Sequence, residues 1–163
     1  MPNDLKTRWF CSQVSMLKDN MYALAIGILK NQADAEDAIQ NTLLSAYEHL
    51  DDLRLLGKVK PWILKILVRE CYDIAGRRRR YVDLSEIPET AAPAEDMDAK
   101  HSVWSAVSRL QATYREVIIL FYYEDLSTRE IAGILNISEE SVRQRLSRAR
   151  AALSLLLNKE DFL

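Results

Sequence analysis

The sequence feature that most constrains the fold is the segment from Ser127 to Arg150, which has the pattern of a helix-turn-helix. Ser127 and Glu130 have the spacing of a capping box, which begins a short helix. Asn136 follows that helix, and asparagine tolerates the left-handed backbone that a tight turn needs. Ser138 is then the expected N-cap of a longer helix. A short helix, a turn of about four residues and a second helix make up the motif that places its second helix in the major groove of DNA.

The two faces of this segment differ in chemistry. One face is apolar, and the opposite face of the longer helix carries short polar groups between arginines. Such a face suits contacts of polar groups with base edges and of guanidinium groups with phosphates or guanines. An alternative interpretation is a solvated amphipathic helix whose arginines only maintain solubility. The residues expected on the buried side are Ile131, Leu135, Ile137, Val142, Leu146, Ala149 and Leu153. Those expected on the DNA side are Glu140, Arg143, Gln144, Ser147 and Arg148, with Arg145 and Arg150 nearer its edges.

The composition favours an all-α fold. Glycine and proline number four each among 163 residues, and straight-chain residues, which lose little rotamer freedom in a helix, are plentiful. Hydrophobic residues make up 48% of the chain, which is enough to build cores. The longest apolar run, Val117–Tyr123, is too short to span a bilayer, and the N-terminus lacks the layout of a signal peptide.

The stretch from Asp83 to Asp98 is expected to separate two domains. It contains two prolines and six acidic residues without a sustained apolar period, which is typical of a flexible linker. We therefore expect two small helical domains joined by an acidic linker. These are an N-terminal helical bundle at residues 1–81, a linker at residues 82–100 and a C-terminal helix-turn-helix domain at residues 101–163.

Apolar periodicity predicts three helices before the linker, packed as a bundle. Asp34 is the expected N-cap of the second helix, Pro61 opens the third, and Gly76 is expected to weaken or end the third. After the linker, one helix begins at Val103 and an apolar helix follows from Tyr114 to Tyr123. The residues expected to face inward before the linker are Leu17, Met21, Leu24, Ile28, Ala35, Ala38, Ile39, Leu43, Ala46, Tyr47, Leu50, Ile63, Ile66, Leu67, Cys71 and Ile74.

The formal net charge of −2 hides two blocks of opposite charge. Residues 31–53 contain six acidic and no basic side chains, whereas residues 54–80 contain nine basic and two acidic ones. Such segregation suggests separate surfaces for separate partners, one of them a polyanion. The acidic helix is interpreted as a docking surface for a protein with basic side chains, or alternatively as a face that only adds solubility. The residues of this acidic face are Asp34, Glu36, Asp37 and Gln40.

The basic block contains a stripe that combines aromatic and cationic side chains, nearly opposite Ile63 and Leu67 on a helix. Proteins that bind single-stranded DNA use such stripes, because rings stack on unpaired bases while cations follow the phosphates. The alternatives are that Trp62 is an ordinary core residue and that the run Arg77–Arg80 only stabilises a helix C-terminus. The members of the stripe are Trp62, Lys65, Arg69 and Tyr72, and Arg77–Arg80 extends its positive charge.

The sequence contains no recognisable catalytic or metal site. Cys11 and Cys71 are interpreted as unpaired thiols in a reducing cytoplasm, and His49 and His101 lie apart from other candidate ligands. We therefore expect no cofactor, no metal ion and no enzymatic activity.

From about Met21 to Leu156 these parts, in this order, resemble the sigma factors of bacterial RNA polymerase, in the extracytoplasmic-function (ECF) class of the sigma-70 family. The family's polymerase-binding helix is similar to the acidic segment NQADAEDAIQNTLLSAYEHL. Its promoter-melting and −10-recognition segment is similar to the basic segment KPWILKILVRECYDIAGRRRR. Its −35-recognition domain looks like LQATYREVIILFYYEDLSTREIAGILNISEESVRQRLSRARAAL.

The resemblance implies a role for each set of residues. Asp34, Glu36, Asp37 and Gln40 are implied to contact the clamp helices of the largest polymerase subunit. The loop Leu53–Val59 is implied to accept a base flipped from the −10 element, and the acidic linker to pass near the RNA exit path. The residues implied along the opened strand are Lys58, Lys60, Lys65 and Arg69, beside Trp62, Tyr72 and Arg77 of the stripe. Those implied at the −35 element are Ser138, Glu140, Ser141, Arg143, Gln144, Arg145 and Arg148, beside Ser147. Two positions depart from the family, because Arg69 stands where many members have Asn and Gly76 where a basic or helix-favouring residue is usual.

A member of this class is expected to be a dissociable promoter-specificity subunit that binds core RNA polymerase, recognises the −35 and −10 elements and helps to open the DNA. Its further expected partner is an anti-sigma factor, and no stable homo-oligomer is expected. The expected location is the cytoplasm, or the membrane where an anti-sigma factor holds the chain. One alternative is a stand-alone helix-turn-helix regulator of duplex DNA, which leaves the acidic face and the Trp62 stripe unused. Another is an interaction module that mimics a sigma domain.

Overall fold

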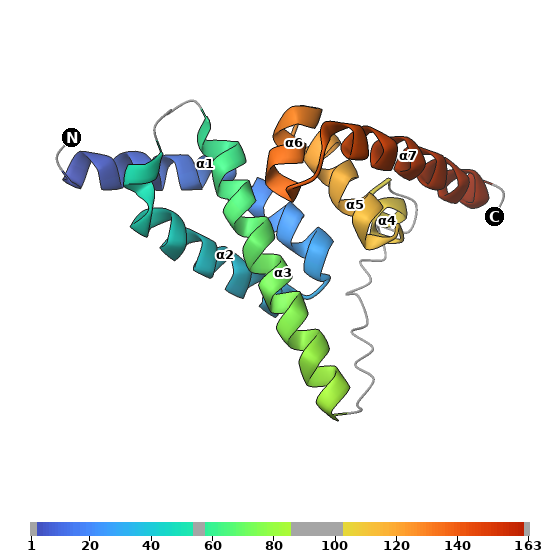
Figure 1. The fold of residues 1–163 in the computed structure, drawn as a ribbon, viewed down its shortest axis with the longest axis horizontal. Coiled ribbons are helices and arrows are strands. Elements are labelled where there is room, and N and C mark those ends of the chain that lie inside the picture. The colour runs from blue at the N-terminus through green and yellow to red at the C-terminus, as the bar shows by residue number, and fades with distance from the viewer. Residues whose placement is uncertain (1–2, 54–57, 86–102, 162–163) are drawn as a thin grey trace. The chain divides into compact units, whose positions relative to one another are not determined.

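The computed structural model describes residues 3–53, 58–85 and 103–161, and these ranges contain helices and turns without any strand (Figure 1). The all-α class expected from the sequence is confirmed. The chain divides into two compact units, residues 1–81 (unit one) and residues 82–163 (unit two). Each unit is described by itself.

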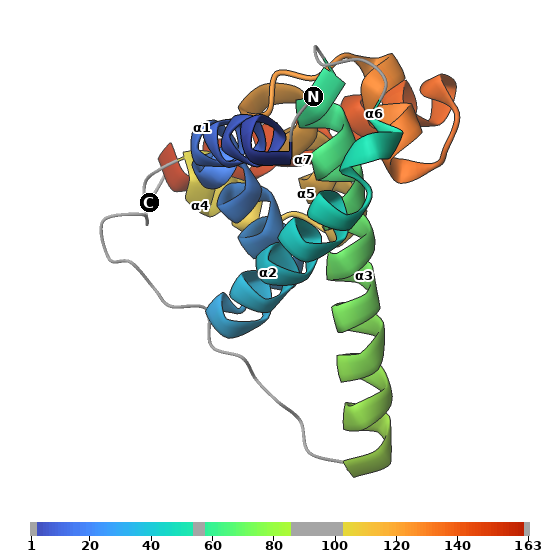
Figure 2. The same cartoon turned by 90° about the vertical axis from the view of Figure 1, so that its left-hand side faces the viewer.

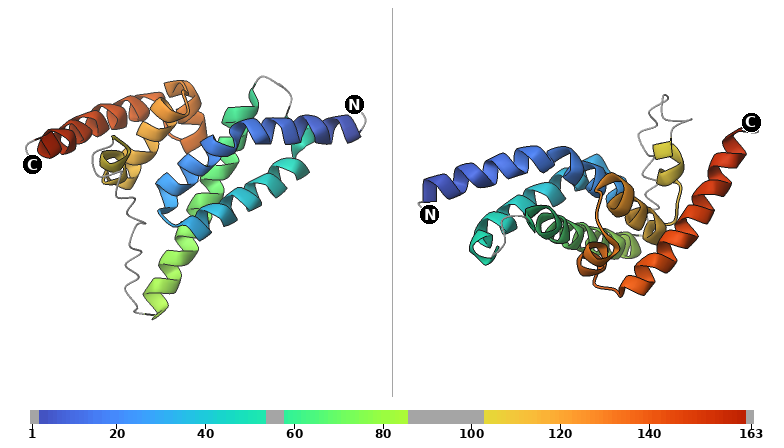
Figure 3. Two further views of the ribbon diagram at one scale, coloured as in Figure 1. Left: turned by 180° about the vertical axis from the view of Figure 1, so that it is seen from behind. Right: turned by 90° about the horizontal axis from the view of Figure 1, so that it is seen from above.

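Unit one is built from three helices. A left-handed residue, Lys30, ends the first helix, and Asn31 caps the second, so the chain reverses within two residues and the first two helices pack against each other. The third helix lies across this pair, as Figures 1 and 3 show. The elements are α1 (Asn3–Leu29), α2 (Gln32–Glu48), the short 3-10 helix η1 (Leu50–Asp52) and α3 (Val59–Ser85).

The core of unit one draws on all three helices. Small buried residues of α2, such as Ala35 and Ala38, allow its close approach to α1, and Met21 and Leu24 of α1 are fully buried. Each large apolar side chain buried in this way contributes about 1.5–3 kcal/mol. A second cluster forms around Phe10, which the sequence analysis did not place in the core because it began the first helix near Leu17. The residues of this cluster are Phe10, Ala46 and Leu50, with Trp9, Val14, Leu43, Leu53, Trp62 and Ile66 packed against it.

Four sequence predictions for this part of the chain are wrong. The N-cap of α2 is Asn31 instead of Asp34, because the Asn31 Oδ1 atom accepts a hydrogen bond from the Asp34 backbone N–H at 2.9 Å. Helix α3 does not end at Gly76 but continues to Ser85, since one interior glycine costs only about 1 kcal/mol against the helix-favouring residues around it. The predicted linker therefore begins inside a helix, and its part from residue 86 onward lies outside the described residues. Tyr47, expected to face inward, is 52% exposed.

Unit two packs four short helical elements against one long helix. Its apolar stretch is one continuous helical run, as predicted, but the run ends in a π turn in which the Glu124 N–H donates to the Ile119 carbonyl at 3.0 Å. Val117, Leu120 and Ile131 are fully buried in its core. The elements are α4 (Val103–Ser108), α5 (Ala112–Ile118), the π helix η4 (Ile119–Tyr123), α6 (Thr128–Leu135) and α7 (Glu139–Asp161), and Figure 2 shows α6 and α7 at the end of the chain.

Gly76 offers a direct test of helix α3. Its φ is not positive and an added Cβ meets nothing within 4 Å, so the Gly76→Ala substitution is expected to raise the free energy of unfolding by about 0.5–1 kcal/mol. Asn136→Ala is a control with the opposite expected result, a lower free energy of unfolding, because Asn136 has φ 57° and alanine is strained there. Urea unfolding followed by circular dichroism measures both. A destabilised Gly76→Ala variant contradicts this description of α3.

The two cysteines are free, with Cys11 exposed and Cys71 buried. Burial, together with the nearby Glu70 carboxylate, raises the pKa of the Cys71 thiol to about 12. Because the thiolate is the reactive form, iodoacetamide at about pH 8.5, near the pKa of an ordinary cysteine, is expected to label Cys11 only, and both thiols after denaturation. A Cys11→Ser variant serves as control, since it leaves no reactive thiol in the native chain. Equal labelling rates for the two native thiols contradict the burial of Cys71.

Candidate nucleic-acid and protein-binding surfaces

Local hydrogen bonds set the geometry of the helix-turn-helix, and the predicted capping residues are confirmed. The Ser127 Oγ atom accepts from the Glu130 N–H at 3.1 Å, and the Ser127 hydroxyl also donates to the Glu130 carboxylate. Asn136 adopts φ 57° and ψ 46° and ends α6. Ser138 Oγ accepts from the Ser141 N–H at 3.1 Å, which begins α7. The chain therefore turns from α6 to α7 within a few residues, without strain at Asn136.

The buried stripe of α7 determines which side chains α7 presents to solvent. Val142, Leu146 and Ala149 are buried and face α5 and α6. On α6 the second buried residue is Ile134 instead of the predicted Leu135, which is half-buried. The sequence-predicted DNA residues that lie exposed are Ser138, Glu140, Arg143, Gln144, Ser147 and Arg148, whereas Ser141 and Arg145 are only partly exposed.

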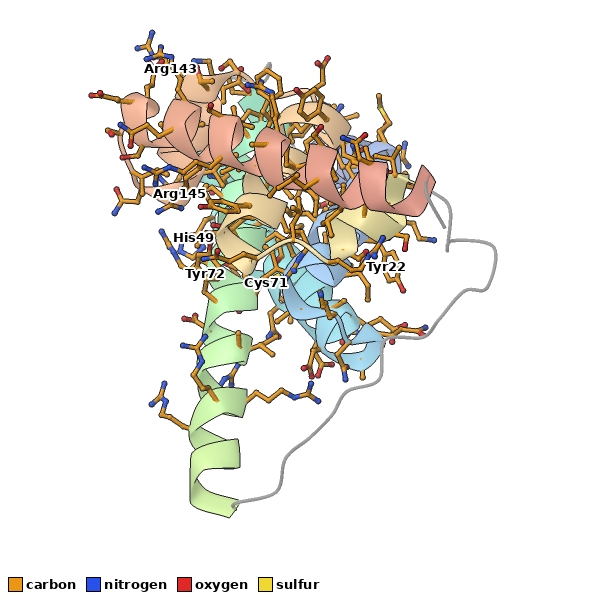
Figure 4. All side chains as sticks on the ribbon, turned by 90° about the vertical axis from the view of Figure 1, so that its right-hand side faces the viewer. Tyr22, His49, Cys71, Tyr72, Arg143 and Arg145 are labelled. Carbon is orange, nitrogen blue, oxygen red and sulfur yellow. The ribbon has the colours of Figure 1, made fainter. Side chains whose placement is uncertain are left out.

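Arg145 turns toward the interior of unit two. Its guanidinium group lies 3.7 Å from the carboxylate of Glu116, a buried residue of α5. Figure 4 shows Arg143 and Arg145 leaving α7 on opposite sides of its ribbon. The neighbouring Arg115 is buried and donates to the Leu110 carbonyl at 2.7 Å; burial lowers the pKa of Arg115, and Glu116 opposes that shift. Arg145 therefore forms an ion pair within unit two, and it is also one of the residues predicted to contact DNA.

Arg150 is likewise engaged within unit two. Its Nε atom donates to the Tyr122 hydroxyl at 2.7 Å, and its guanidinium carbon lies 5.5 Å from the centre of the Phe121 ring. This contact fastens the C-terminal part of α7 to η4. Among the arginines of α7, Arg143 and Arg148 remain on the exposed face, where Arg143 also pairs with Glu139 on its own helix.

The basic stripe of α3 is mostly exposed, with one exception. Trp62 is half-buried against the cluster of Phe10, Ala46 and Leu50, so much of its side chain belongs to the core, as the alternative interpretation of this residue held. Tyr72, 44% exposed, is then the aromatic residue best placed for a ligand. Among the basic residues in and near the stripe, Lys58, Lys65, Arg69, Arg77, Arg79 and Arg80 are exposed, while Lys60 and Arg78 are half-buried. Residues 54–57 of the loop predicted to hold a flipped base lie outside the described residues, and Val59 is buried.

The acidic face of α2 divides into exposed and paired residues. Glu36, Asp37 and Gln40 are exposed, whereas the Asp34 side chain is 18% exposed and lies 3.2 Å from the Arg78 guanidinium group. Leu44, which was not predicted from the sequence, is 66% exposed and lies four residues after Gln40, on the same face. Its i+4 spacing was the available signal. A single exposed leucine is common on protein surfaces, so Leu44 bears on docking only through the acidic residues on the same face.

The described residues contain no group of three or more side chains placed to hold a metal ion. None of the described helices combines the length and apolar character needed to cross a membrane.

Comparisons with known proteins agree with the resemblance given by the sequence. Residues 14–81 match the family model described as Sigma-70 region 2, and residues 100–153 match the one described as Sigma-70, region 4. The chain is 33% identical over 146 residues to RNA polymerase sigma factor SigV of Bacillus subtilis, covering 88% of each protein. It is 29% identical over 151 residues to ECF RNA polymerase sigma factor SigM of the same bacterium, covering 88% of this chain and 92% of SigM.

Two solved structures have similar folds. The sigma factor RpoE of Bartonella quintana, in complex with the anti-sigma factor NepR, gives a TM-score of 0.77 at 27% identity, over 91% of this chain and 96% of RpoE. CnrH in complex with the cytosolic domain of CnrY gives a TM-score of 0.66 at 27% identity, over 94% of this chain and 90% of CnrH.

Proposed function

Since this chain belongs to the sigma-70 family of RNA polymerase sigma factors, in the ECF class, and is a promoter-recognition subunit of that polymerase, we propose that its two units divide promoter recognition between them. Unit two reads the duplex −35 element, and unit one docks on core polymerase and captures the opened −10 element. The observation that carries this division is the exposed face of α7, opposite its buried stripe and directly after a capped tight turn.

The −35 element is met by the N-terminal half of α7. Arg143 and Arg148 are exposed and contact phosphates or guanines, while the exposed Gln144 between them contacts a base edge. Arg145 contributes less directly, because its pairing with Glu116 holds it toward α5. The shorter polar residues assigned to this contact are Ser138, Glu140, Ser141 and Ser147.

The opened −10 strand is met by the basic stripe of α3. Unstacking and flipping a base costs a few kcal/mol, and binding of the flipped base offsets that cost, so the DNA is opened by capture without any bond being made or broken. Tyr72 stacks on an unpaired base, while Lys65 and Arg69 follow the phosphates. Lys58, Lys60, Trp62 and Arg77 complete this contact.

Docking on core polymerase uses the exposed face of α2. Glu36, Asp37 and Gln40 lie before the exposed Leu44 on α2, which gives an apolar contact next to acidic groups for a partner with basic side chains. Asp34, which was implied in docking by the resemblance, is left out of the proposed docking face because it is paired with Arg78 and mostly buried. Core binding also sets the distance between the two DNA-binding surfaces, so the second DNA contact becomes intramolecular and gains effective concentration. With a formal net charge of −2, the free chain binds DNA weakly.

The same reasoning assigns the chain a regulatory rather than a catalytic role in the cytoplasm, where it meets core polymerase. An anti-sigma factor is a further proposed partner, because the similar structures of RpoE and CnrH were solved with NepR and the cytosolic domain of CnrY.

Charge reversal on α2 tests the docking surface. The Asp37→Lys substitution is expected to weaken binding to core polymerase at least about tenfold, because it places a cation against a basic partner. Asp19→Lys, the same change at an exposed position of α1, is expected to leave binding unchanged. Fluorescence anisotropy of the labelled chain with purified core measures both. Equal binding by Asp37→Lys and wild type removes α2 from the docking surface.

The division of the α7 arginines into DNA contacts and internal contacts is tested by promoter binding. The assay uses core polymerase loaded with this chain and a promoter fragment that was identified by mapping the transcripts the loaded polymerase makes. Arg148→Ala is expected to weaken promoter binding about tenfold and to lower the salt dependence of log K by about 1, as loss of a phosphate contact does. Arg150→Ala is expected to leave that salt dependence unchanged and to lower thermal stability, since Arg150 packs on Phe121 and Tyr122. A salt dependence that falls equally in both variants contradicts this sorting.

A further inference from the structure

An ion pair joins the acidic and basic blocks inside unit one. The Asp34 Oδ2 atom of α2 lies 3.2 Å from the Arg78 Nη1 atom of α3, and the two side chains are 18% and 37% exposed. Both residues belong to sets that the sequence alone assigns to outside partners, a basic protein for Asp34 and phosphates for the arginine run. In the folded chain they neutralise each other.

The position of Asp34 is fixed by the start of α2. Its backbone N–H is bound to the Asn31 side chain, so Asp34 lies in the first turn of the helix. A carboxylate is favoured there by the positive end of the helix dipole. Asp34 Oδ2 is buried and accepts no hydrogen bond, so the Arg78 guanidinium group at 3.2 Å supplies its charge partner.

Helix geometry shows what the anchor controls. Arg78 follows Arg69 by nine residues, or about two and a half turns, so the two arginines point to opposite sides of α3. Arg80 follows Arg69 by eleven residues, about three turns, and lies on the same side as Arg69. The buried residues Leu67, Val68 and Cys71 set the direction of Arg69. Holding Arg78 against α2 keeps Arg80, which lies beyond Gly76, on that same outward side.

The anchor acts on a part of α3 that has little other support. Figures 1 and 2 show the C-terminal end of α3 extending past the start of α2. Gly76 lies two residues before Arg78, and a glycine makes this stretch of helix easier to distort. An ion pair at Arg78 restrains the segment where Gly76 weakens it.

We propose that Asp34 and Arg78 are positioning residues whose ion pair fixes the C-terminal half of α3 on the docking helix, so that Arg80 stays aligned with Arg69 along the opened strand. Neither residue contacts polymerase or DNA. The proposal rests on the proposed function, in which the α3 stripe binds the opened −10 strand. It also means that Asp34 is not part of the docking surface and that Arg78 is not a DNA contact.

The test compares Asp34→Asn, Arg78→Gln and the double variant in two assays of the full chain with core polymerase. Permanganate reactivity of unpaired thymines measures strand opening, and anisotropy measures affinity for core. Each single variant is expected to lower opening by about fivefold, and the double variant to lose no more than either single one, because both remove the same interaction. Affinity for core is expected to stay within about twofold of wild type. A merely destabilised chain would lose both activities together.

Arg78→Lys and Arg69→Ala complete the design. Arg78→Lys retains a cation for Asp34 and is expected to open DNA nearly as wild type does, which provides a folded variant if Arg78→Gln misfolds. Arg69→Ala tests the stripe itself. If Arg69→Ala lowers opening while Asp34→Asn does not, the positioning role is overturned and the proposed function stands. If Arg69→Ala has no effect, both are overturned. Additive losses in the double variant, or a loss of core affinity in Asp34→Asn as large as in Asp37→Lys, also overturn the positioning role.

Discussion

The apolar stripe on each helix determines which charged side chains this chain presents to a partner. Because α7 buries Val142, Leu146 and Ala149, and the helix has 3.6 residues per turn, Arg148 must point away from the core. The same constraint acts in unit one, where Ala35 and Ala38 bind α2 to α1 and thereby expose Asp37. The acidic, basic-aromatic and arginine-rich surfaces are consequences of packing, and they lie on helices that are rigid enough to keep them in place.

Short-range features could be predicted from the sequence, and long-range pairs could not. Ser127, Asn136 and Ser138 act on backbone groups within three or four residues, so their spacing alone predicts the caps and the turn. The pairs Asp34–Arg78 and Glu116–Arg145 depend on which helices lie together, and charge spacing carries no signal for that. As a result, the sequence assigned both arginines to DNA, whereas the fold holds both of them partly inside.

Composition alone therefore overstates the positive charge available to DNA. On α7, Arg145 and Arg150 are engaged with Glu116 and with Tyr122, and on α3 Arg78 is engaged with Asp34. These side chains stiffen the scaffold, and the remaining exposed arginines are the ones proposed to contact DNA. Under the proposed function, a chain with weak net attraction for DNA depends on core polymerase to bring its two surfaces to the promoter together.

Transcription by purified core polymerase, with and without this chain, tests the central claim most directly. With genomic DNA from the source organism as template and transcript 5′ ends mapped by sequencing, the account predicts initiation at a discrete set of sites that requires the chain. Those sites are predicted to share two sequence elements upstream, one for each unit. The contradicting result is the same pattern of 5′ ends with and without the chain.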